Sequence, residues 1–345
     1  MGAGCDAGRN LSRRRRVGAT HAPVAIARGF HPPYPTRDPV LSGRITGRRG
    51  SGAFAAECGG MGGGVGREVI RTVREMTIGV KTMTANESEE EAQCILEQMG
   101  CSVTKILESA GKTPDFLCSF DGASFLVEVK HRCDSAFEEK RRKSLESVGT
   151  YNYISPVVKQ KSTSRKIHNA VKQLSSEDFS NTKFRIIWLT ASGFRAETIT
   201  RHHKATLYGI KPIVSSGSQY LMDCYFFEES DFFKHRSTLD AAIICSDSDK
   251  VDLVEVQLCL NPLSPNYLQL LATAFVKLFG TAVVDPNTHE KQGDALQIVI
   301  DLDRKDIAGL YEHLSEKYSL KMPQSLTMNE IGSITLIHPI EKELP

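Results

Sequence analysis

The chain has 345 residues, of which 40% are hydrophobic and 24% charged, and its formal net charge is +2. This length and composition indicate one or two globular domains with enough chain for a sizeable core. No apolar run reaches the roughly eighteen residues of a membrane-spanning helix, so we expect a cytoplasmic protein without a membrane span. The nine cysteines form no C-x-x-C pair, which is typical of reduced core residues rather than of a zinc site.

The first 75 residues differ in composition from the rest. They contain thirteen Arg, no Lys and five acidic residues, a net charge of +8, whereas residues 76–345 carry −6. The segment is rich in Gly and lacks apolar periodicity, so we expect it to be disordered. It could be a basic arm that binds phosphates, an organelle transit segment, or upstream sequence translated from a start codon set too early. We favour the last, with Met76 or Met83 as the real start, because Arg-only usage indicates a change of base composition.

Residues 112–132, KTPDFLCSFDGASFLVEVKHR, predict a β-hairpin. Apolar runs flank Asp121-Gly122, and Asp-Gly between two such runs is a strong signal for a type I′ turn. Side chains alternate between the faces of a strand, so Glu128 and Lys130 share one face. Without further information, this pattern is also that of a surface hairpin with a solvated ion pair.

The hairpin resembles the PD-(D/E)xK nucleases, the restriction-endonuclease-like superfamily. Pro114-Asp115 is followed, after twelve residues, by Glu128-Val129-Lys130. The resemblance implies that Asp115 and Glu128 bind Mg²⁺, or Mn²⁺ in its place, with the Val129 carbonyl as a further ligand. It also implies that Lys130 orients or deprotonates a metal-bound water that attacks a phosphodiester. These strings are short, so the resemblance rests on their order and spacing.

A helix is expected before the hairpin, at residues 86–100. Apolar residues recur there at helical spacing from Ala92 to Met99. The family places a helix at this point, often with an acidic residue facing the site, and Glu89 resembles that residue as an additional metal ligand. An alternative stays open, because with Asn86 as the N-cap Glu89 falls at N3, where a glutamate caps the helix.

Basic residues follow the hairpin. The run at 140–143 is as consistent with a solvated loop or helix as with a nucleic-acid contact. Lys159 and Lys161 lead directly into the next helix and are stronger candidates for binding nucleic acid.

The next helix is expected at 164–174, with Ser164 as its N-cap. The corresponding family helix often sends a polar or basic residue toward the site. Lys166 and Gln173 are therefore carried over as candidates for binding nucleic acid.

Residues 184–190 predict a central strand, because the run is almost continuously apolar. A helix at 195–207 and a strand at 207–214 follow. Adjacent residues of a helix do not face each other, so His202-His203 in this helix is not interpreted as a metal pair. The expected fold is α/β, with a restriction-endonuclease-like α-β-β-β-α-β core and a mixed central sheet over residues 84–215.

Residues 216–345 are expected to form a C-terminal α+β lobe of unknown role, with strands near 219–228, 239–246, 251–260, 295–301 and 333–338 and helices near 266–279 and 304–318. Asp240, Glu255 and Gln257 in this region echo the first motif, with Gln in place of Lys. We interpret the echo as an ordinary half-buried hairpin, with a degenerate copy or a variant site as the alternatives.

The sequence therefore predicts a Mg²⁺-dependent endonuclease that hydrolyses phosphodiester bonds in DNA, with RNA as an open alternative substrate. A catalytically inactive nucleic-acid-binding or assembly module on the same fold is the second hypothesis, and the −6 charge of residues 76–345 favours it, because nucleic-acid binders usually carry a basic surface. The oligomeric state stays open, with a homodimer among the alternatives.

Overall fold

The computed structural model describes residues 83–335, apart from 108–112, 136–137, 139, 141–149, 177–178, 180–181, 194, 218–219 and 248–253. The predictions for residues 1–75 and for the basic run after Lys140 lie outside the described residues. Contacts divide the chain into Met1–Gly63 and Gly64–Pro345, and everything described below belongs to the second unit. No helix in the described ranges is long and apolar enough to cross a membrane.

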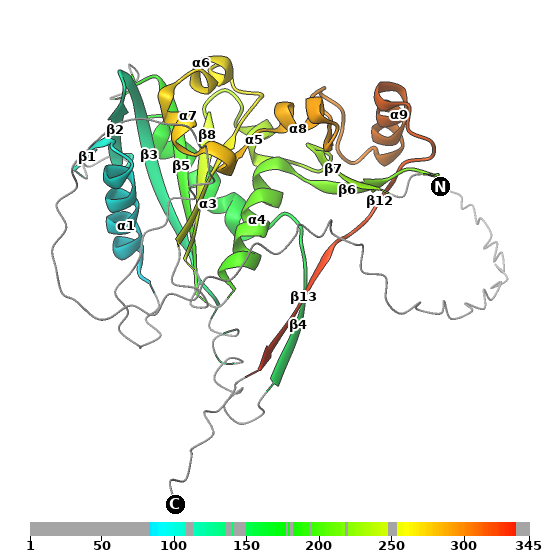
Figure 1. The fold of residues 1–345 in the computed structure, drawn as a ribbon, viewed down its shortest axis with the longest axis horizontal. Helices are drawn as coiled ribbons and strands as arrows, with labels where there is room; N and C mark the ends of the chain where they lie inside the picture. The colour runs from blue at the N-terminus through cyan, green and yellow to red at the C-terminus, as the bar shows by residue number, and fades with distance from the viewer. Residues whose placement is uncertain are drawn as a thin grey trace, which may run out of the picture. The chain divides into compact units, whose positions relative to one another are not determined.

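A mixed seven-stranded sheet lies at the centre, in the order β1-β2-β3-β5-β8-β9-β10 (Figure 1). Its strands are β1 (Ser102–Lys105), β2 (Phe116–Phe120), β3 (Ala123–Arg132), β5 (Phe184–Ser192), β8 (Ala241–Asp247), β9 (Val254–Leu260) and β10 (Val283–Val284). The neighbours β3, β5 and β8 are parallel, whereas β1, β2 and β3 form an antiparallel meander. The α/β class with a mixed central sheet agrees with the prediction from the sequence.

Helices cover both faces of this sheet. Helix α1 (Ala85–Gln98) packs Ala92 and Leu96 against the face that carries Val127 and Trp188. On the opposite face, α3 (Lys161–Leu174) and α4 (Ala196–Tyr208) pack in a second apolar cluster with Ile187. Strand β5 is therefore buried on both sides, as its nearly continuous apolar run predicts.

Two predicted helix starts are wrong. Thr84, not Asn86, is the N-cap of α1, and its capping box is completed by Glu87, so Glu89 does not cap the helix. Helix α3 begins at Lys161, three residues before the predicted cap, and the Ser164 hydroxyl instead donates to Asp231 at 2.8 Å. In α1 a second possible cap lies two residues earlier, whereas α3 begins without a side-chain cap because its start is set by packing.

A second, four-stranded sheet has the order β11-β7-β6-β12. Its strands are β11 (Ala295–Gln297), β7 (Leu221–Tyr225), β6 (Lys211–Val214) and β12 (Gln324–Ser325). The strand predicted at 207–214 is therefore shorter than expected and does not belong to the central sheet. It pairs with β7 because Gly209 ends α4 in a left-handed conformation that turns the chain away from the central sheet.

The remaining short elements lie after β7. They are α5 (Asp231–Lys234), α6 (Tyr267–Leu271), α7 (Ala274–Leu278), a 3₁₀ turn η2 (Gly280–Ala282), α8 (Pro286–Gln292) and α9 (Ile307–Tyr318). The single helix predicted near 266–279 is thus two short helices. Apolar residues of α9 pack on the second sheet, in a separate cluster with Ile213 and Leu296.

Residues 216–345 do not form a separate lobe, contrary to our expectation. Strand β8 pairs in parallel with β5, and β9 pairs with β8, so both belong to the sheet that carries the PD-(D/E)xK-like hairpin. Strand β8 is apolar on both faces, so it is stable only inside a sheet whose two faces are covered by helices.

A two-stranded antiparallel ribbon stands apart from both sheets. It consists of β4 (Thr150–Pro156) and β13 (Asn329–Thr335), which lie side by side in Figure 1 although they are far apart in the sequence. Strand β4 was not predicted, because its pairing partner lies far away in the sequence, near the end of the chain.

Candidate functional site

The hairpin has the predicted geometry. Asp121 and Gly122 both have positive φ, 46° and 76°, as a type I′ turn requires. The register pairs Phe116 with Val127, so Asp115, the residue before β2, comes opposite Glu128. The turn thereby brings the two carboxylates of the motif to neighbouring positions on one face.

Glu128 is completely buried, at 0% exposure. Its Oε1 atom accepts from the Lys130 ammonium, and its Oε2 atom accepts no hydrogen bond from a donor among the described residues. A side-chain hydrogen bond links the Glu128 and Asp115 carboxyl groups. Burial, reinforced by the negative charge of Asp115 and opposed by Lys130, raises the pKa of Glu128 to about 8. A buried carboxylate oxygen without a partner is costly, and a cation is one of the groups that can satisfy it.

The Asp115 carboxylate lies against β3. Its Oδ2 atom accepts a 2.7 Å hydrogen bond from the Val129 N–H. Burial raises the Asp115 pKa, the Val129 bond and the Lys130 charge lower it, and Glu89 raises it. Asp115, Glu128 and Lys130 therefore form one electrostatically coupled group.

Glu89 lies at the margin of this group. Its carboxylate is paired with Lys105 of β1 at 3.0 Å, and its side chain is 23% exposed. Since its charge acts on Asp115, Glu89 lies near the motif, but its carboxylate is paired with Lys105. A role as metal ligand would require it to leave Lys105.

Two residues of α3 contact the backbone beside the motif. The Gln173 amide donates to the Thr113 carbonyl at 3.1 Å, two residues before Asp115. The Lys166 ammonium donates to the His131 carbonyl, the residue after Lys130. Both were predicted to bind nucleic acid, and the structure places both as supports of the motif strands.

Arg132 lies beside the motif but was not among the site residues predicted from the sequence. It follows Glu128 and Lys130 on the same face of β3, it is half-buried, and its guanidinium donates to the Thr163 hydroxyl at 2.8 Å. The alternation that placed Glu128 and Lys130 together extends by two residues to Arg132, so the same signal predicts its position.

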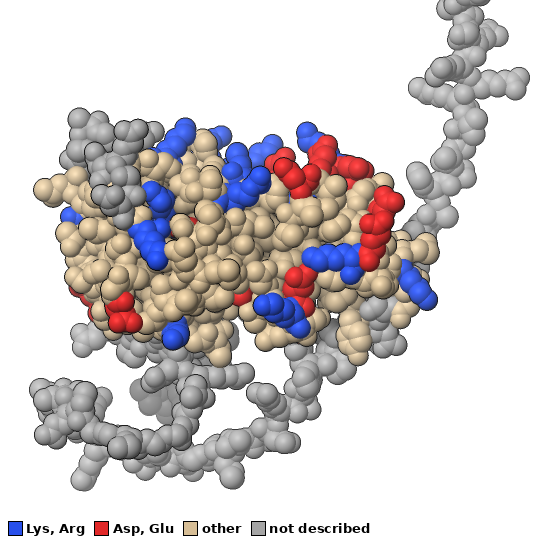
Figure 2. Space-filling model, turned by 90° about the horizontal axis from the view of Figure 1, so that it is seen from above, with Lys and Arg blue, Asp and Glu red and all other residues tan. Residues whose placement is uncertain are grey.

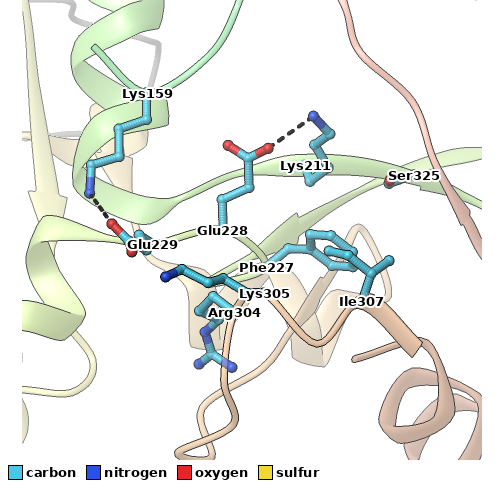
Figure 3. Close-up of a pocket in the computed structure, with 9 residues that line it drawn as sticks. All are labelled: Lys159, Lys211, Phe227, Glu228, Glu229, Arg304, Lys305, Ile307 and Ser325. Carbon is cyan, nitrogen blue, oxygen red and sulfur yellow. Dashed lines mark hydrogen bonds and ion pairs between the residues drawn. The ribbon is translucent and has the colours of Figure 1, made fainter. Parts of the chain in front are cut away.

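Lys159 does not join the motif. It contacts Glu229 and the buried Asp231, each at 3.5 Å, and lines a pocket of about 410 Å³ (Figure 3). The pocket is lined by Lys159, Lys211, Phe227, Glu228, Glu229, Arg304, Lys305, Ile307 and Ser325. Its cations are largely paired, since Lys211 contacts Glu228 at 2.9 Å.

Lys161, the other predicted nucleic-acid contact before α3, is the first residue of that helix and is exposed.

The Asp240/Glu255/Gln257 echo does not form a site. In the β8–β9 register, Glu255 pairs with Ser246, whereas Asp240 precedes Ala241 at the other end of the strand. The Asp240 carboxylate accepts from the Ser264 hydroxyl and from the Arg185 N–H, which accounts for its burial. The echo is an ordinary antiparallel strand pair, as we favoured, but β8 is almost completely buried rather than half-buried.

The donor set of the motif suits a hard cation. Asp115 and Glu128 offer carboxylate oxygens, and Mg²⁺ typically takes one or two carboxylates and keeps several waters. Within the described residues, no group of three or more His, Cys, Asp and Glu side chains converges as a metal site. The fit therefore rests on two carboxylates and on the buried Oε2 atom of Glu128, which accepts no hydrogen bond from a donor among the described residues.

On the face shown in Figure 2, basic and acidic side chains of the described residues are interspersed and do not merge into one basic band.

Comparison with protein-family models, with curated proteins and with solved structures finds no match for this chain. The contacts of Asp115, Glu128 and Lys130 are therefore the basis for assigning a chemistry to this site.

Proposed function

We propose that the chain is a metal-dependent nuclease that hydrolyses phosphodiester bonds in DNA. One observation carries the proposal: the buried Glu128 lies opposite Asp115 and in contact with Lys130, and its Oε2 atom accepts no hydrogen bond from a donor among the described residues. Burying the Glu128 carboxylate beside a second carboxylate is costly unless Glu128 holds a proton or binds a cation.

The order of elements supports the restriction-endonuclease-like assignment. Helix α1 precedes the β1-β2-β3 meander, α3 follows, and β5 lies parallel to β3. With β4 set aside, since it lies between β3 and α3 in the chain but belongs to the separate ribbon, this order is consistent with the α-β-β-β-α-β core that the resemblance implies. The strands beyond β5 extend the sheet and leave this order unchanged.

The roles follow from the contacts. Asp115 and Glu128 would hold Mg²⁺, which supplies a water of lowered pKa and neutralises charge on the scissile phosphate. Lys130 would position that water or stabilise the phosphate, since its ammonium already lies at the Glu128 carboxylate. Because the Glu128 pKa is raised to about 8, this carboxyl group holds a proton near neutral pH in the metal-free protein and would have to release it to bind a cation.

The test is cleavage of supercoiled plasmid and of single-stranded DNA by the purified chain, with Mg²⁺ or with a chelator. Asp115→Asn should reduce the Mg²⁺-dependent rate by about a hundredfold or more and leave the circular dichroism spectrum unchanged. Glu255→Gln is the matched control, because Glu255 is an exposed carboxylate on β9, and it should cleave as the wild type does. Equal cleavage by Asp115→Asn and wild type would refute the proposal.

The inactive binding module is the second candidate. The net charge of −6 on residues 76–345 favours it, because a basic surface usually accompanies nucleic-acid binding. Calorimetric titration with Mg²⁺ and Mn²⁺ separates the two functions. Metal binding that Asp115→Asn abolishes supports the nuclease, and no binding by the wild type supports the module.

A further inference from the structure

The β4–β13 ribbon has little support from the rest of the described chain. Each of its strands contacts chiefly the other strand, and neither has extensive contacts with another helix or strand. Ile154, in the middle of β4, is 69% exposed. Since an isolated two-stranded ribbon is marginally stable in water, this one would gain from an additional strand.

The backbone pattern shows which groups such a strand would meet. Val157 N–H donates to the Met328 carbonyl, which makes these opposite residues a hydrogen-bonded pair. Hydrogen-bonded and non-hydrogen-bonded pairs alternate along an antiparallel ribbon. The pairs Asn329–Pro156, Ile331–Ile154 and Ser333–Asn152 are therefore non-hydrogen-bonded, with their N–H and C=O groups directed outward.

The two outer edges of the ribbon differ. On the β4 edge, Pro156 occupies an outward position and has no N–H to donate, which protects that end. On the β13 edge, the outward positions are Asn329, Ile331, Ser333 and Thr335, none of which is a proline or a charged residue. Glu330 lies at an inward position, where its backbone groups pair with Ser155.

Edge strands of monomeric proteins are usually protected by prolines, by charged residues or by bulges. The β13 edge lacks the first two, and its seven residues pair with β4 in unbroken register. Its lack of basic residues argues against a nucleic-acid partner, which would require positive charge.

We infer that the outer edge of β13 pairs with the same edge of a second copy of this chain. Two copies related by a twofold axis place identical strands antiparallel, so each outward N–H finds an outward C=O, and the interface is self-complementary. The two ribbons then form one four-stranded sheet, which relieves the marginal stability of each. This inference uses only the ribbon and does not depend on the proposed function.

The test is the molar mass of the full chain by light scattering after size-exclusion chromatography. Wild type should have twice the mass of one chain, and Ser333→Pro, which removes one outward N–H from β13, should be monomeric. Asn152→Pro is the matched control, because Asn152 lies directly across from Ser333 and its N–H points outward from the other edge. It should remain dimeric.

Three outcomes would overturn the inference. A monomeric wild type excludes the dimer, and a dimeric Ser333→Pro excludes the β13 edge. Monomers for both proline variants would show that pairing does not discriminate between the edges. Equal far-ultraviolet circular dichroism spectra of the two variants would show that the mass difference is not caused by misfolding.

Discussion

The carboxylate of Asp115 accepts a 2.7 Å hydrogen bond from the backbone N–H of Val129. Val129 lies between Glu128 and Lys130, so this bond fixes Asp115 against the strand segment that carries the other two residues of the motif. The three charged groups are thus positioned by backbone geometry, through one turn, one register and one hydrogen bond.

Glu128→Gln should remove much of the pH dependence of stability in the metal-free protein. The folded pKa of Glu128 is raised to about 8 from 4.5, so between these values the folded state binds a proton that the unfolded state has released. Stability should therefore fall as pH rises from about 4.5 to about 8, by at most about 1.4 kcal/mol per pH unit. Urea unfolding across this range in the presence of a chelator measures the effect, and identical slopes for wild type and variant would contradict it.

Lys130→Met should separate metal binding from cleavage. Loss of the ammonium raises the Glu128 pKa further, because Lys130 lowers it in the wild type. At a pH above this value Glu128 is ionised, and Mg²⁺ binding should persist while cleavage falls about a hundredfold or more. Calorimetry and plasmid cleavage on the same sample provide the two readouts. Cleavage within tenfold of the wild type would exclude Lys130 from the chemistry.

Gln173→Ala should lower the cleavage rate strongly while it lowers the free energy of unfolding only slightly. The variant loses the 3.1 Å bond to the Thr113 carbonyl, which should cost about 1 kcal/mol of stability. Since Thr113 lies two residues before Asp115, a shift of the carboxylate should lower cleavage about tenfold or more. Gln93→Ala on α1 is the control, because it also removes one side-chain amide bond, to Glu97, but away from the motif. Equal cleavage by the two variants would show that Gln173 does not position Asp115.

Gly209→Ala should destabilise the whole fold. Gly209 ends α4 with φ of +61°, and a Cβ atom there would lie 2.3 Å from the Glu228 carbonyl oxygen. The left-handed conformation and the backbone clash together should cost about 2 to 4 kcal/mol. Gly217→Ala isolates the conformational part, because its φ is +81° and nothing lies within 4 Å of its Cβ position. Urea unfolding of both variants measures the difference, and equal losses would contradict the clash.

Several local features follow from the sequence alone. The Asp121-Gly122 turn, the shared face of Glu128 and Lys130 and the doubly buried strand at 184–190 depend on neighbouring residues and on simple periodicity, so they were predicted and observed. The sequence also indicated an α/β protein with a mixed sheet.

Only the tertiary structure decided the rest. It places β8 beside β5 and β9 beside β8, directs β6 into a second sheet and pairs β4 with the distant β13. It also pairs Glu89 with Lys105 and directs Gln173 to the backbone before Asp115. The physical reason is that turns and side-chain alternation are set over a few residues, whereas strand partners and charge partners are selected by burial and hydrogen bonding between segments distant in the chain.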